Sequence, residues 1–184
     1  MRLLQLDEVW WLVALQNPLK PKQGMAPYAD RLEAARAIAR HPNIRVLDIE
    51  ARTRTFYTID TLKVLQLSFP RVNFVWLMGA DNLAQMSHWR RWTKIFGLVP
   101  IAVFDRAPYS FDAIASKAAH AFERFQLRTK DAHYLVEQKP PAWIFFHTRL
   151  HPGSATKIRA RRALIHSQPR SEPQPEPRRK PSSA

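Results

Sequence analysis

An apolar run at residues 72–78 that ends in a sharp turn constrains the fold more than any other part of the chain. The run, VNFVWLM, is short and apolar on both faces, which is typical of a buried strand in a parallel sheet. It is followed by residues 79–82, GADN, at the carboxyl end of the strand, where open α/β sheets bind their ligands. Asp81 is therefore a candidate acceptor for a sugar hydroxyl, and Trp89 could offer a flat face to a ring. In the competing interpretation Asp81 caps the next helix and Trp89 anchors the core.

Other apolar runs alternate with segments of helical periodicity. Further strands are predicted at residues 8–15, 44–49, 100–104 and 142–148. Helices are predicted after Pro27, after Thr58, between the turn and Phe96, over residues 109–125 and from Ser154 onward, whereas residues 126–141 are predicted to form a loop. Five strands that alternate with helices indicate an α/β fold, with a doubly wound parallel sheet covered by helices on both faces.

Composition limits the location and the domain count. The 184 residues suit one domain, predicted at residues 1–167, and the proline-rich, charged residues 168–184 are expected to be a disordered tail. There is no cysteine, which excludes disulfides and thiolate metal sites and favours a reducing cytoplasm. No apolar run approaches the ~20 residues of a membrane span, so we expect no membrane partner. No feature of the sequence predicts an oligomeric state.

The formal net charge of +14 raises the prospect of a polyanionic partner, either nucleic acid or nucleotide phosphates. The basic residues are scattered, with brief clusters at residues 90–91, 159–162 and 178–180. They do not form a basic helix or an RNA-binding signature. The charge fits a solvated surface at least as well as a nucleic-acid groove, so nucleic acid is not the expected partner.

A hydroxyl-rich turn after the last predicted strand is the candidate phosphate site. Residues 153–159, GSATKIR, would place free backbone N–H groups and the positive end of a helix dipole beside an anion. Arg159 lies one turn further on. The alternative is a plain helix cap, because Ser and Thr are preferred there. The chain contains no G-x-G-x-x-G pattern and no Walker loop, and its seven histidines show no metal-ligand spacing.

Four motifs in a fixed order resemble one family. NPLK, TFYTIDTL, GADN with Trp89 eight residues past Asp81, and SATKIR together resemble the bacterial nicotinate-nucleotide adenylyltransferases. These belong to the HxGH-type nucleotidyltransferases, which have a Rossmann-like sheet. The resemblance runs from about Leu6 to Arg162. Each motif alone is weak, and the ordered set is specific.

The resemblance implies a reaction and its site. ATP and nicotinate mononucleotide would be the substrates, with Mg²⁺ bridging the ATP phosphates and no covalent protein intermediate. Asp81 would hold the substrate ribose, Trp89 would stack on the nicotinate ring, Thr58 would lie near the ring's carboxylate and Lys20 would meet phosphate. The residues implied to bind ATP are Gly79, Ser154, Thr156 and Arg159, and Arg159 is also the implied catalytic residue.

Two departures from the family pattern stand out. Gly153 and Ala155 replace the usual Ile and second Ser. The first strand, the glycine-rich loop and the H-x-G-H motif that open the family pattern are not found in this sequence.

The first strand lies centrally in the doubly wound order, so without it the two neighbouring strands would keep unpaired backbone groups. Each such group would cost about 1–3 kcal/mol, against a domain stability of about 5–15 kcal/mol. We therefore expect a translation start roughly 20–25 residues upstream, and a chain that is poorly soluble or inactive as given.

Three alternatives remain at the level of sequence. The chain could be a sister adenylyltransferase with another acceptor, such as phosphopantetheine, although Trp89 together with Thr58 argues against that acceptor. It could be an inactive fragment. It could also be a basic nucleic-acid-binding protein on the same fold, which salt-dependent binding without ATP turnover would favour.

Overall fold

The computed structural model describes residues 1–16, 25–106 and 108–147. These residues lie in a compact unit, Met1–Leu150. The lysine of the NPLK motif, the SATKIR motif and the predicted tail lie outside the described residues.

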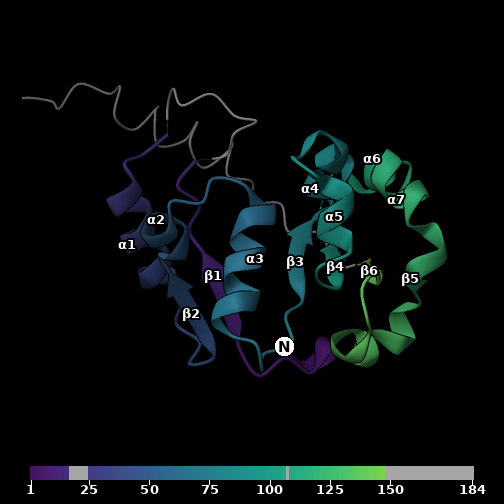
Figure 1. Cartoon of the computed structure of the whole chain (residues 1–184), viewed down its shortest axis with the longest axis horizontal. Coiled ribbons are helices and arrows are strands. Elements are labelled where there is room, and N and C mark those ends of the chain that lie inside the picture. Colours follow the sequence, from purple (N-terminus) through teal and green to yellow (C-terminus); the bar gives the residue numbers. More distant parts are fainter. Residues whose placement is uncertain (17–24, 107, 148–184) are drawn as a thin grey trace, which may run out of the picture. The chain divides into compact units, whose positions relative to one another are not determined.

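Short helices and short strands alternate along the described chain (Figure 1). In chain order they are η1 (Arg2–Leu4), β1 (Val9–Leu12), α1 (Tyr28–Ile38), β2 (Ile44–Leu47), α2 (Ile49–Thr53), α3 (Thr58–Ser68), β3 (Trp76–Gly79), α4 (Ala80–Gln85), η2 (Met86–His88), α5 (Trp92–Phe96), β4 (Ile101–Phe104), α6 (Ser110–Ile114), α7 (Lys117–Ala121), η3 (Glu123–Phe125), β5 (Gln126–Leu127), η4 (Thr129–Glu137) and β6 (Trp143–Phe146), where η denotes a 3₁₀ helix.

Within residues 1–16, 25–106 and 108–147, all paired strands are parallel and they form two sheets. One sheet pairs β1 with β2, and the other has the order β3-β4-β6-β5. The prediction of a parallel α/β fold is confirmed. The break between the two sheets falls between β1 and β3. In the doubly wound order 3-2-1-4-5-6, this is the position of the strand numbered 1, between the strands numbered 2 and 4.

The second sheet is buried on both faces, and its side chains alternate between two cores. Ile101 and Val103 of β4 pack with residues of α3 to α7. Ala102 between them packs on the other face with Leu4 of η1 and Leu135 of η4. The same alternation runs along β6, whose four residues are all buried. A strand that is buried on both faces needs an unbroken apolar run, which explains why both strands were predicted, β4 to within one residue and β6 as the central part of residues 142–148.

The break in the sheet shortens the strand predicted at residues 72–78. Among the described residues, β1 pairs with β2 alone and β3 pairs with β4 alone. A cavity of about 850 Å³ is lined by β1 and by residues 71–77. Strand pairing in β3 is therefore restricted to Trp76–Gly79, and Val72 is 44% exposed. The predicted strand at residues 8–15 contracts to β1 for the same reason, with Trp11 41% exposed.

Residues 126–141 are not the predicted loop. They contain β5 and η4, with Ala132 and Leu135 of η4 buried against the second sheet. Side chains three residues apart align in a 3₁₀ helix, and this spacing matches neither the period of 2 of a strand nor the period of 3.6 of an α-helix. The helix predicted over residues 109–125 is also divided, because Ser116 accepts a hydrogen bond from the backbone N–H of Ala119 (3.2 Å) and starts α7 afresh.

In the part of the chain that the structure describes, no helix has the length and apolarity needed to cross a membrane.

Candidate active site

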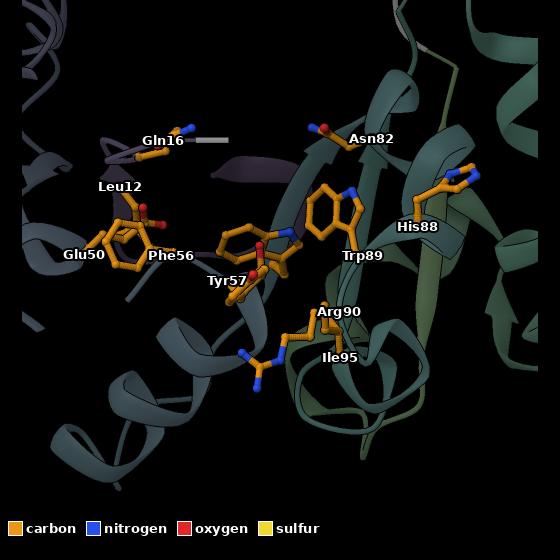
Figure 2. A pocket seen from close by; sticks show the side chains of 13 residues that line it. Leu12, Gln16, Glu50, Phe56, Tyr57, Asn82, His88, Trp89, Arg90 and Ile95 are labelled. Carbon is orange, nitrogen blue, oxygen red and sulfur yellow. The ribbon is translucent and has the colours of Figure 1, made fainter. Parts of the chain in front are cut away.

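A pocket of about 230 Å³ lies at the carboxyl end of β1, beside the turn after β3 and the start of α3. It is lined by Leu12, Ala14, Gln16, Glu50, Phe56, Tyr57, Thr58, Trp76, Asn82, His88, Trp89, Arg90 and Ile95 (Figure 2). The carboxyl ends of parallel strands are where ligands bind in open α/β sheets. The pocket brings together Thr58 and Trp89, two of the residues implied by the family resemblance.

Thr58 is the first residue of α3, an eleven-residue helix whose positive dipole end lies at the pocket. The preceding residue, Tyr57, has an extended backbone (φ −117°, ψ 135°), and its carbonyl accepts hydrogen bonds from the N–H groups of Asp60 (2.9 Å) and Thr61 (3.1 Å). The buried residues Ile59 and Leu62 hold the helix against the core. The first turn of α3 is thus a rigid edge suited to an anionic group.

Trp89 has two environments at once. It is half-buried and packs against the main core cluster, and it also lines the pocket. It lies between η2 and α5 with an extended backbone (φ −78°, ψ 144°). Its backbone N–H donates a hydrogen bond to the backbone carbonyl of Met86 (2.9 Å). The indole is therefore anchored by the core without being enclosed by it, which leaves part of the ring available to a ligand.

Arg90 is a pocket residue that sequence reasoning missed. Its guanidinium lies 4.8 Å from the centroid of the Tyr57 ring and 3.8 Å from the carboxylate of Asp60. Its position directly after Trp89 in a short basic cluster was the available signal. Trp76 was also missed, and its indole nitrogen is buried without a hydrogen-bond partner among the described residues.

Asp81 lies next to the pocket but is not among its lining residues, whereas its neighbour Asn82 is. It does not cap α4 with its side chain, because the N-cap position is Gly79 and no side-chain cap bond forms there. Instead its carboxylate, 18% exposed, pairs with Arg106 (3.3 Å). Gly79 gives this carboxylate room, since a Cβ atom at that position would meet Oδ1 of Asp81 at 2.5 Å.

A second carboxylate lies at the same edge of the sheet. Asp105, directly after β4, is 11% exposed and accepts a hydrogen bond from the hydroxyl of Ser110. The Nδ1 atom of His147, directly after β6, lies 3.7 Å from its other oxygen. Two polar contacts to Asp105 thus lie where β4 and β6 end. Asp105 and His147 each follow a strand directly, and Asp81 was singled out by a similar position just after a strand.

Four of the implied site residues, Lys20, Ser154, Thr156 and Arg159, lie outside the described residues. Within residues 1–16, 25–106 and 108–147, no group of three or more histidine and carboxylate side chains is placed to hold a metal ion. Asp81 and Asp105 are carboxylates at the carboxyl edge of the four-stranded sheet. Asp81 pairs with Arg106 and Asp105 with Ser110 in this structure, and their oxygens are of the kind that suits Mg²⁺, which commonly takes one or two carboxylates and completes its shell with phosphates and water.

Comparison with known proteins places the chain among nucleotidyltransferases. Residues 1–161 match the cytidylyltransferase-like family. A probable nicotinate-nucleotide adenylyltransferase of Parvibaculum lavamentivorans is 49% identical over 161 residues, which cover 88% of this chain and 80% of the relative. A probable nicotinate-nucleotide adenylyltransferase of Ruegeria pomeroyi is 44% identical over 160 residues, covering 87% and 75%.

A solved structure supports the fold. The Plasmodium falciparum nicotinic acid mononucleotide adenylyltransferase, complexed with NaAD, superposes with a TM-score of 0.54 at 14% identity. The match covers 82% of this chain and 63% of that one, so the chain spans less than two thirds of its length.

Proposed function

The chain belongs to the cytidylyltransferase-like family and, within it, to the bacterial nicotinate-nucleotide adenylyltransferases, and we propose that it transfers AMP from ATP to nicotinate mononucleotide. The products are nicotinate adenine dinucleotide and pyrophosphate, so the reaction is a step in NAD biosynthesis. The observation that carries the proposal is the shared pocket of Thr58 and Trp89, a helix start beside an aromatic face. The cysteine-free composition supports a cytoplasmic location.

The pocket suits a pyridine ring that carries a carboxylate. Trp89 stacks on the ring, and the start of α3 at Thr58 attracts the acid group through its dipole. Arg90, in the same pocket wall, adds a positive charge. Trp76 also lines the pocket, and its buried indole N–H has no hydrogen-bond partner among the described residues, which is rare in folded proteins.

The ATP side of the site rests on the resemblance and on the carboxyl edge of the second sheet. Gly79 lies at this edge and leaves room for the carboxylate of Asp81, which holds the ribose of the mononucleotide. Ser154, Thr156 and Arg159 hold the ATP phosphates, and Lys20 meets phosphate. Carboxylates such as Asp81 and Asp105 would help to hold a Mg²⁺ ion that accompanies ATP, and the ion would offset the charge of the ATP phosphates.

The reaction needs positioning and charge stabilisation rather than covalent chemistry by the protein. The phosphate of the mononucleotide attacks the α-phosphorus of ATP in line, and pyrophosphate leaves. Holding both substrates in register converts a bimolecular step into an effectively unimolecular one. Cationic side chains such as Arg159 stabilise the charge that develops on the departing pyrophosphate.

A direct assay tests the proposal. The chain is incubated with ATP, Mg²⁺ and nicotinate mononucleotide, and the dinucleotide and pyrophosphate are quantified in equal amounts by chromatography. Nicotinamide mononucleotide and phosphopantetheine replace the acceptor in parallel. Product with phosphopantetheine alone would point to the sister enzyme, and salt-sensitive nucleic-acid binding without pyrophosphate release would refute the adenylyltransferase assignment.

Arg159→Lys is expected to lower kcat/KM although it keeps the charge. A lysine lacks the planar fork that binds a phosphate through two hydrogen bonds. Steady-state kinetics with varied ATP measure the effect, and Arg161→Lys in the same basic cluster is the control. An Arg159→Ala variant with wild-type kcat/KM would remove Arg159 from the proposed site.

A further inference from the structure

The guanidinium of Arg31, on α1, bonds to two separate parts of the backbone. Its Nη1 donates to the carbonyl of Ala14 (2.6 Å) and its Nη2 to the carbonyl of Leu15 (2.9 Å). Its Nε donates to the carbonyl of Ala26 (3.1 Å). One side chain thus ties the segment that leaves β1 to the segment that enters α1. The three bonds use three separate nitrogens of a rigid planar group, a geometry that the single ammonium of a lysine does not have.

Glu50, on α2, binds the same segment through a backbone N–H group, whereas Arg31 binds it through backbone carbonyls. The Oε2 atom of Glu50 accepts a hydrogen bond from the N–H of Leu15 (3.1 Å). Leu15 is therefore held at its N–H by Glu50 and at its carbonyl by Arg31. Arg31 and Glu50 are also close enough for their charges to attract each other.

The segment they hold is a wall of the pocket and lies outside regular secondary structure. The ladder between β1 and β2 ends with the bond from the N–H of Val13 to the carbonyl of Leu47 (3.2 Å). Residues 14–16 continue beyond it without helix or strand. Ala14, Gln16 and Glu50 line the pocket, and Figure 2 shows Gln16 and Glu50 on its side opposite Trp89. A pocket wall without ladder bonds needs another support to keep its shape.

We propose that Arg31 and Glu50 are positioning residues that fix residues 14–16 as the wall opposite Trp89, and that they thereby set the affinity for nicotinate mononucleotide. This inference rests on the proposed function. Neither side chain takes part in the chemistry. Their contribution is pre-organisation, because a wall that is ordered before binding removes an entropic cost from the binding step.

The ionisation of Glu50 separates this role from a purely structural one. Burial raises the pKa of Glu50 above its usual value of 4.5, although the bond from Leu15 and the charge of Arg31 act in the opposite direction. Tyr28 and Arg31 face this region from α1, and Asp48 precedes α2. A carboxyl whose pKa is raised on folding contributes less to the unfolding free energy as the pH rises from about 4.5 through the raised pKa. The buried carboxyl of Glu50 therefore contributes less to the unfolding free energy above this pH range than below it, and we assign its value to the pocket.

The experiment compares variants of the full chain by calorimetric titration with nicotinate mononucleotide and, separately, with ATP. Arg31→Ala is expected to weaken the mononucleotide about tenfold or more, because hydrogen bonds from a charged donor to the wall are lost. Arg31→Lys should also weaken it, since one ammonium group cannot reproduce the fork. Affinity for ATP should stay within about twofold of wild type. Arg36→Ala removes the same charge from an exposed position on the same helix and should change neither affinity.

Glu50→Gln keeps the shape and an acceptor oxygen but loses the charge. We expect weaker mononucleotide binding and no loss of melting temperature at neutral pH. Above about pH 4.5 the melting temperature of this variant should vary less with pH than that of the wild type. Glu50→Ala should weaken binding further. Wild-type affinity in both Arg31→Ala and Glu50→Ala would overturn the inference, as would equal losses for both ligands together with a lower melting temperature. A wild-type chain that binds no mononucleotide would instead overturn the proposed function, and this inference with it.

Discussion

Replacing Trp89 by alanine is expected to weaken the binding of nicotinate mononucleotide by about five- to a hundredfold and to leave ATP binding nearly unchanged. Stacking of a base on an aromatic side chain is worth roughly 1–3 kcal/mol, which corresponds to this range. The indole both packs on the core and lines the pocket, so its loss removes a ligand contact as well as some packing. Titration calorimetry of each substrate measures the two affinities separately.

The packing role of Trp89 needs its own control. Trp92, three residues further on, is also partly buried against the main core, and its ring meets that of Phe122 at 6.0 Å between centroids. Trp92→Ala should lower the melting temperature and should not change the affinity for one ligand more than the affinity for the other. Trp89→Phe should keep much of the stacking. If Trp89→Ala and Trp92→Ala lose stability alike and neither changes mononucleotide affinity in the folded protein, Trp89 is a core anchor only.

The sequence predicted the fold best where both faces of a strand are covered. β4, which has neighbours on both sides in the second sheet, spans Ile101–Phe104 and matches the strand predicted at residues 100–104, whereas β6, also paired on both sides, keeps Trp143–Phe146 of the strand predicted at residues 142–148. β1 and β3 each have one paired neighbour among the described residues, and both are shorter than their apolar runs. A run of apolar residues indicates a capacity to be buried, whereas the length of a strand depends on the partner available to it.

The predictable part of the site is the part carried by local motifs. Thr58 and Trp89 were implied by two motifs, and the structure brings them to one pocket. The contacts of Arg31 with Ala14 and Leu15 span 17 and 16 residues, and that of Glu50 with Leu15 spans 35. Such pairings arise from the fold, and neither residue belongs to a pattern that could mark it in advance.

Gly79 and Asp81 also have a contact that their motif did not predict, although they are only two residues apart. The sequence implied that both serve the nucleotides, and the structure adds how the two depend on each other. Gly79 has φ −82° and ψ 159°, a backbone conformation open to any residue, so it is not kept for a turn. A Cβ atom there would instead meet Oδ1 of Asp81 at 2.5 Å and Cδ of Arg106 at 3.6 Å. Glycine at this position gives room to a carboxylate.

Gly79→Ala is therefore expected to act as a substitution of Asp81. The added methyl group displaces a flexible side chain rather than backbone, so the unfolding free energy should change by less than about 1 kcal/mol. Substrate affinity should fall about ten- to a hundredfold, the value of hydrogen bonds to a charged group. Asp81→Ala should match this loss. Titration of the folded variants with each substrate gives the affinities, and thermal unfolding gives the stability.

The double variant decides whether Gly79 acts through Asp81. If it does, Gly79→Ala combined with Asp81→Ala should bind no more weakly than Asp81→Ala alone, because the methyl group then has no carboxylate to displace. Gly97→Ala is the matched control, since a Cβ atom there meets the carbonyl oxygen of Lys94 at 3.5 Å, an ordinary contact. Losses that add in the double variant would mean that Gly79 contacts the nucleotide itself, and the close approach of its backbone to the substrate would then replace the carboxylate as the reason for glycine at this turn.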